Sequence, residues 1–207
     1  MKRAVLSLCC CALTLLAFPN ALRAESSPAV QAAVVGLRAE CPQAIIYEHA
    51  GQVTRVGGQP LAFGVSPEDA AERFIQRHAA VFGTTVDQLV PEGLDAAVGP
   101  VQPLMLEPEL DGFKFLLVRY AHQIAGVPVF RSDLRLLVRN EADFPLVLAA
   151  SAVRNVGTFT PNAALLARPI DPARYLAGQF DYYSTPTPVI FAGADGQSST
   201  PHLGYLF

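Results

Sequence analysis

The sequence predicts an α+β protein in which an antiparallel sheet carries one main helix on a face. Two observations favour the sheet: apolar and charged residues alternate from Phe130 to Arg139, and the run from Phe113 to Tyr120 is apolar at almost every position. A third favours the helix, because apolar residues recur at spacings of three and four between residues 66 and 82. The dry face of the sheet over residues 113–153 is the expected partner of this helical stripe.

Residues 1–24 have the pattern of a signal peptide. Lys2 and Arg3 precede an apolar run from Ala4 to Phe18, and a cleavage site is expected after Ala24. The run is too short to span a bilayer comfortably, so a signal anchor is the less favoured alternative. A lipoprotein signal at Cys9–Cys11 is disfavoured because the large Leu8 precedes the first cysteine. The expected localisation is secreted, either extracellular or periplasmic.

The charge of the mature chain narrows the class of partner. Cleavage after Ala24 removes Lys2, Arg3 and Arg23 and no acidic residue, so the net charge falls from −3 to −6. A mildly acidic chain lacks the basic footprint that nucleic acids and anionic membranes require, so neither is expected as a partner, whereas protein and peptide partners remain open. Only Cys41 survives cleavage, which leaves no intrachain disulfide. A buried or incidental thiol is expected there, although a thiolate could in principle ligate a protease zinc.

The first ordered element is expected to be a hairpin after Pro42. Residues 25–43 have small side chains and little periodicity, and are predicted to form a loose leader. Residues 45–47 and 53–56 are strand-like and flank the turn His49–Gln52. Gly57, Gly58 and Pro60 are then expected to end the second strand.

The main helix has clear start and stop signals. Ser66 can cap the first turn, Pro67 suits the first helical position, and two acidic residues lie near the positive end of the helix dipole. Gly83 can adopt the left-handed conformation that ends a helix. The predicted buried stripe contains Ala71, Phe74, Ile75, His78 and Phe82.

The central hairpin is expected to turn over Ala125–Pro128 and to be followed by a third strand over 146–150, which makes an antiparallel meander. Its second strand divides its side chains between two faces, with Leu137 as the exception. The dry face is predicted to hold Phe130, Leu134, Leu136 and Val138. The wet face is predicted to hold a charged stripe of Arg131, Asp133, Arg135 and Arg139. A partner that docks on the open sheet would meet this stripe first. Residues 90–111 contain four prolines and no period, and are expected to be a long connection.

A smaller helix-plus-hairpin unit is predicted over residues 158–207. Thr160–Pro161 and Asp171–Pro172 each begin a short helix, and Gly178 is the expected stop of the second. Two strands follow over 189–192 and 203–207.

Two blocks of sequence resemble the fungalysin/thermolysin propeptide domain, the pro-segment of some secreted zinc metallopeptidases. The helix block runs from Ser66 to Gly83, and the hairpin block begins at Arg119. In the hairpin block the residues that carry the resemblance are Tyr120, Gly126, Pro128, Phe130, Ser132, Asp133 and Leu134. The sequence departs from the family pattern at Arg131, where a small residue is usual.

The resemblance implies a domain over residues 44–157, followed by a second subdomain over 158–207 that is similar to an incomplete PepSY-like unit. It further implies a non-catalytic pro-domain that acts as intramolecular chaperone and inhibitor of a zinc metallopeptidase, in cis or in trans. The peptidase itself is not in these residues, so a truncated or a free-standing pro-domain is expected. The alternative is a secreted module that binds a peptide or ligand unrelated to proteolysis.

Catalytic and metal-binding motifs are not found in the sequence. No pair of histidines flanks a glutamate on one helix face, and the four histidines, at positions 49, 78, 122 and 202, are isolated from one another. Neither a nucleophile elbow nor a phosphate loop is present. We therefore expect no catalytic residue, no metal ligand and no cofactor, and predict that the protein is not an enzyme.

Overall fold

The computed structural model describes residues 26–93, 99–110, 112–176, 182–194 and 197–207 of the 207-residue chain. The predicted signal peptide, with its cleavage site at Ala24, lies outside the described residues, as does Gly178.

An open antiparallel sheet forms the larger part of the protein, and the α+β prediction is confirmed. The strand order is β1-β2-β7-β6-β5-β3, and β4 also pairs with β5. Every pairing among these strands is antiparallel. The strands are β1 (Ile45–His49), β2 (Gln52–Ala62), β3 (Leu89–Pro91), β4 (Val101–Glu107), β5 (Gly112–Ile124), β6 (Val127–Arg139) and β7 (Leu146–Ser151).

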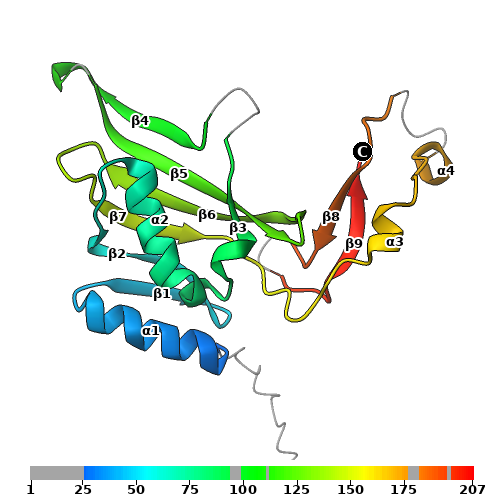
Figure 1. Ribbon diagram of the computed structural model, residues 1–207, viewed down its shortest axis with the longest axis horizontal. Helices are drawn as coiled ribbons and strands as arrows, with labels where there is room; N and C mark the ends of the chain where they lie inside the picture. Colours follow the sequence, from blue (N-terminus) through cyan, green and yellow to red (C-terminus); the bar gives the residue numbers. More distant parts are fainter. Residues whose placement is uncertain (1–25, 94–98, 111, 177–181, 195–196) are drawn as a thin grey trace, which may run out of the picture.

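The predicted helix is present as α2 (Pro67–His78), which lies across one face of the sheet (Figure 1). The Ser66 hydroxyl accepts a hydrogen bond from the Asp69 N–H at 3.1 Å and so satisfies a free donor of the first turn. A 3₁₀ turn (Ala79–Phe82) extends the helix to Gly83, whose φ of 72° is the left-handed stop. The predicted stripe is buried and packs on β2, β5, β6 and β7.

The core lies between α2 and one row of the sheet. Val56, Ala149, Leu136 and Val118 are paired in register across β2, β7, β6 and β5, and all are buried. Because side chains alternate along a strand, the neighbouring residues of each strand face the opposite side. This second side of the sheet is called the open face below.

The expectation of a loose leader over residues 25–43 is wrong. Residues Pro28–Glu40 form helix α1, which begins with a hydrogen bond from the Val30 N–H to the Ser27 hydroxyl and has proline near its start. Leu37 is 0% exposed and belongs to the same core cluster as α2. The domain therefore includes residues before 44. The helix was not predicted because few of its side chains are buried, so its apolar residues show only a weak helical period.

Both predicted hairpins are present. The β1–β2 turn has positive φ at Ala50 and Gly51, and the β5–β6 turn has positive φ at Ala125 and Gly126, as two-residue hairpins of the right-handed twist require. The expectation that Gly57–Pro60 would end the second strand is wrong, because β2 continues to Ala62 with a break in its pairing to β7.

A bulge in β6 corrects the predicted position of Phe130. Near the turn Gln123 pairs with Pro128, but two residues earlier Ala121 pairs with Asp133, so β6 contains extra residues here. Arg131, with φ of 50°, lies within this bulge. Phe130 consequently leaves the dry face of Leu134 and packs at 5.9 Å from the ring of Phe191.

The expected connection over residues 90–111 contains strand structure instead: β3 ends at Pro91, and β4 pairs with β5. The apolar run from Phe113 to Tyr120, which is typical of a strand covered on both faces, is covered on one face only. Val118 and Tyr120 are buried against the core, whereas Phe113 is exposed and Leu117 is only partly buried.

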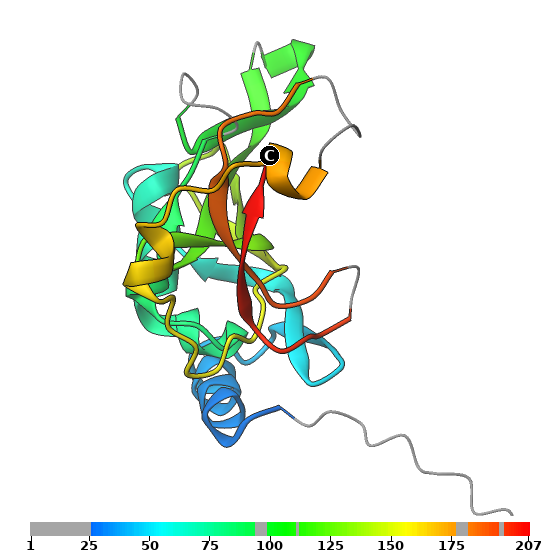
Figure 2. The same ribbon diagram turned by 90° about the vertical axis from the view of Figure 1, so that its right-hand side faces the viewer.

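Residues after Val156 form the smaller predicted unit. It contains α3 (Ala163–Leu166), α4 (Ala173–Leu176), β8 (Thr187–Phe191) and β9 (His202–Leu206), with β8 and β9 antiparallel. Figure 2 faces this end of the molecule. The unit joins the larger sheet through one parallel pairing of Ile190 with Val129, and a second core cluster forms there from Ile124, Val127, Val129, Val156, Ile190 and Ala192.

Candidate functional site

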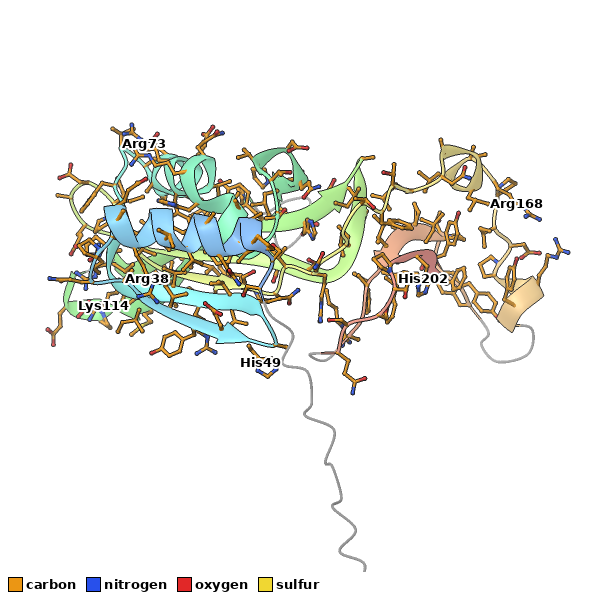
Figure 3. The ribbon with its side chains drawn as sticks, turned by 90° about the horizontal axis from the view of Figure 1, so that it is seen from below. Arg38, His49, Arg73, Lys114, Arg168 and His202 are labelled. Atoms are coloured by element: carbon orange, nitrogen blue, oxygen red, sulfur yellow. The ribbon has the colours of Figure 1, made fainter. Side chains whose placement is uncertain are left out.

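The candidate site is the open face of the sheet. Figure 3 shows α1 and α2 on one side of the sheet, with Arg73 of α2 on that side. The opposite side has no helix lying across it among the residues that the structure describes. A sheet face without a second layer leaves its side chains available to a partner.

A row of side chains rich in arginine crosses this open face. The strand register places Arg119 opposite Arg135, Arg135 opposite Ala150, Ala150 opposite Arg55, and Arg55 opposite Tyr47. Like charges directly opposite each other in a sheet repel, so the close pair of Arg119 and Arg135 needs an anion beside it.

Asp133 supplies that anion. Its Oδ2 accepts a hydrogen bond from Arg119 Nε at 3.1 Å and another from Arg135 Nε at 2.9 Å. Glu92, at the edge of the sheet, lies 3.6 Å from the other side of the Arg119 guanidinium. Asp133 is 3% exposed, while the two arginines are partly exposed. The buried carboxylate thus fixes two guanidiniums in place at the surface, and its own Oδ1 is buried without a hydrogen-bond partner.

An apolar row lies beside the arginine row. Leu137, the residue that broke the predicted alternation, pairs with Leu117 on one side and with Leu148 on the other. All three side chains are partly exposed on the open face. Leu148 pairs with Gly57 of β2, and Gly57 pairs in turn with Ile45 of β1, which is 52% exposed. Adjacent apolar and cationic rows are typical of a surface that binds another molecule.

Three pockets adjoin the Arg119–Asp133–Arg135 cluster, and Arg135 lines all of them. The first, of about 410 Å³, reaches toward β1 and β2 and includes Tyr47 and Arg55. The second, of about 340 Å³, lies toward β4 and includes Gln102 and Leu117. The third, of about 440 Å³, reaches β8 and β9 and includes Phe130 and Leu206.

A buried histidine and serine lie at the third pocket. The Ser132 hydroxyl accepts a hydrogen bond from the Arg154 N–H and bonds His122 Nδ1, both at 2.9 Å. Burial lowers the pKa of His122 to about 4, so the imidazole is neutral at pH 7. Its Nε2 is buried without a hydrogen-bond partner. His122 and Ser132 thus supply two members of a nucleophilic arrangement, but the His122 nitrogen that a third, orienting group would contact has no partner among the described residues.

The residues of the predicted docking stripe are only partly brought together. Asp133 and Arg135 are in one cluster, but Asp133 is buried, so its expected place on a solvated stripe is wrong. Arg139 lies further along the strand and pairs with Glu141 at 3.5 Å. Arg131 is displaced by the bulge and lies over the ring of Phe130 at 5.2 Å.

The residues of the family resemblance have distinct positions. Tyr120 and Leu134 are buried in the main core, and burial raises the pKa of Tyr120 to about 12. Gly126 forms the hairpin turn. The remaining residues line the third pocket, namely Pro128, Phe130, Ser132 and Asp133.

Sequence reasoning missed Arg119 and Arg55 as members of the site. Arg119 is the one charged residue between Phe115 and Tyr120, which was a usable signal. Regular pairing outward from the β5–β6 turn would, however, have placed it opposite Ser132, and only the bulge brings it to Arg135.

Metal-binding clusters of three or more His, Cys, Asp or Glu side chains do not occur within the described part of the chain. Cys41 is buried, and this burial raises the pKa of its thiol. His78 is buried on α2, and burial lowers its pKa despite Glu40 at 3.6 Å. In the same described ranges, no helix has both the length and the apolar character to cross a bilayer.

Comparisons with known proteins return no match: no family model fits the chain, and neither a curated protein nor a solved structure is significantly similar to it.

Proposed function

We propose that this protein is a secreted, non-catalytic pro-domain that binds a zinc metallopeptidase through the open face of its sheet. In this role it assists folding of the peptidase and blocks the active site. The two sequence blocks that resemble the fungalysin/thermolysin propeptide support the class of protein. In the same proposal, residues 158–207 correspond to a PepSY-like subdomain, which the helices followed by an antiparallel hairpin support.

The observation that carries the proposal is the combination of arginine and apolar rows on an uncovered sheet face. The protein has a net charge of −3 overall, yet this face concentrates Arg55, Arg119 and Arg135 beside Leu117 and Leu137. A cationic surface on an acidic protein favours an acidic partner and steers its approach.

The physical basis of a chaperone role is linkage. A pro-domain that binds the folded peptidase and not its unfolded chain stabilises the folded state in proportion to the logarithm of its concentration over the dissociation constant. The same contact excludes substrate if it covers the cleft.

The test is to titrate the purified protein into a thermolysin-like zinc metallopeptidase whose own pro-segment has been removed. Inhibition at micromolar concentration, together with a higher yield of active peptidase on refolding from denaturant, is the expected result. If neither inhibition nor a higher refolding yield were observed, the proposal would be contradicted.

A secreted peptide-binding module unrelated to proteolysis is the second candidate. The three pockets that meet at Arg135 favour it, because they offer a small ligand charged and apolar walls without any peptidase. Peptide binding without inhibition of the peptidase would support this candidate.

A further inference from the structure

The centre of the open face is a fixed pair of cations. Asp133 holds Arg119 and Arg135 through one carboxylate oxygen, at 3.1 and 2.9 Å. A guanidinium has five N–H donors, more than the contacts to Asp133 and Glu92 use. Because the arginines are already held, a second carboxylate could bind them with little loss of side-chain freedom.

The charge around this centre favours an anion. Among the charged residues that line the third pocket, Arg119, Arg131 and Arg135 outnumber Glu92 and Asp133. Asp133 is shared between Arg119 and Arg135, and Glu92 lies against Arg119, so two carboxylates face three guanidiniums in this pocket. Arg55 adds a further cation in the first pocket.

The third pocket also has an apolar wall within reach of the same centre. The larger apolar side chains of this wall come from β6 near its turn and from the C-terminal hairpin, and they include Val129, Phe130, Val189 and Leu206. Val129 and Val189 are buried, while Leu206 is 45% exposed. A ligand that binds here meets both guanidiniums and apolar side chains in one pocket.

We infer that the groove formed by these three pockets binds an extended, acidic segment of its partner, with a carboxylate side chain at Arg119 and Arg135 and a neighbouring apolar side chain in the third pocket. This inference rests on the proposed function, because it identifies which part of the partner occupies the open face. The carboxylate gives orientation through paired guanidinium contacts, and the apolar group adds burial.

The test uses two fluorescein-labelled, C-terminally amidated peptides, Gly-Glu-Leu-Phe-Gly and Gly-Gln-Leu-Phe-Gly, and measures fluorescence anisotropy. The protein is expected to bind the glutamate peptide about tenfold more tightly, as one charge-assisted contact provides, and this preference should shrink as salt is raised. Equal affinities for the two peptides would overturn the inference.

Arg135→Gln is the variant that locates the contact, and Arg73→Gln on α2 is its matched control. The two side chains are 56% and 55% exposed, and both pair with an aspartate, but Arg73 lies on the helical side of the sheet. Arg135→Gln should abolish the preference for glutamate, and Arg73→Gln should leave it unchanged. An unchanged preference in a folded Arg135→Gln protein would also overturn the inference, and Arg119→Gln, with the same expected loss of preference, is the second variant if the first does not fold.

Parallel assays separate this inference from the proposed function. Inhibition of the metallopeptidase without a preference for the acidic peptide removes the inference and leaves the pro-domain proposal. A preference for the acidic peptide without inhibition removes the pro-domain proposal and leaves an acidic-peptide groove.

Discussion

At the scale of single residues, the open face depends on the buried carboxylate of Asp133. Arg119 and Arg135 lie directly opposite each other on the neighbouring strands β5 and β6. Their mutual repulsion is relieved because one oxygen of Asp133 accepts hydrogen bonds from both. A buried charge with two partners is costly to disturb, since removing one member leaves the others without compensation.

Asp133→Asn is therefore expected to lower the free energy of unfolding by about 2 kcal/mol, the scale of hydrogen bonds to a charged group. Glu141→Gln is the control, because Glu141 pairs with Arg139 in an exposed setting and should change stability by less than about 0.5 kcal/mol. Urea unfolding at pH 7 measures both. Equal effects of the two substitutions would show that burial of Asp133 has no energetic consequence.

His122 gives the stability a pH dependence of known sign. Its pKa in the folded protein is about 4, below the ordinary 6.5, so between these values the unfolded chain binds a proton that the folded protein does not. Unfolding free energy should thus fall as the pH drops from 7 to 4.5, by about 2 kcal/mol from this residue alone. His122→Gln, which cannot titrate, should show a shallower fall in urea unfolding. Identical slopes would contradict a buried, neutral imidazole.

At the scale of elements, the strong periodic segments were predicted correctly and the weak ones were not. Ser66, the apolar stripe and Gly83 each specify α2 locally, and the two positive-φ turns specify the hairpins. Helix α1 has the same start signal, Ser27 followed by Pro28, but it lacks a clear apolar stripe, because Leu37 is its one buried residue and the remainder of the helix is small and mixed. Strands β3 and β4 were hidden by prolines, which edge positions tolerate.

The importance of α1 can be measured with two truncations on the same helix. Leu37→Ala removes a side chain that is 0% exposed and should lower the free energy of unfolding by about 2–5 kcal/mol. Val35→Ala, at a side chain that is 69% exposed, should change it by less than about 0.5 kcal/mol. Thermal or urea unfolding distinguishes them. If Leu37→Ala were as mild as its control, residues 28–40 would not be part of the folded domain.

The candidate site shows where reasoning from sequence stops. Arg135 and Asp133 were predicted as surface charges, but their cluster depends on Arg119, whose pairing is shifted by the bulge around Arg131. The same segment of β6 pairs at Val129 with Ile190, more than sixty residues away in the sequence, and the local pattern of β6 does not predict either feature. Leu137 is an exception to the alternation of apolar and charged residues in β6. Only the sheet register explains it, because it places Leu137 in an apolar row with Leu117 and Leu148.

At the scale of the whole molecule, the two sides of the sheet have different roles. The side under α1 and α2 contains the main core, and the other side combines the arginine cluster, the apolar row and the three pockets. The C-terminal hairpin contributes one wall of the third pocket. This division supports a protein that holds a partner on its open face, which is the central claim.

The most direct test of that claim is calorimetric binding of the purified protein to a thermolysin-like zinc metallopeptidase, compared between Arg135→Glu and Arg73→Glu. Charge reversal within the open face should weaken binding by about tenfold or more, and charge reversal on α2 should change it by less than about twofold. No measurable binding by the unaltered protein, or equal binding by both variants, would contradict the claim.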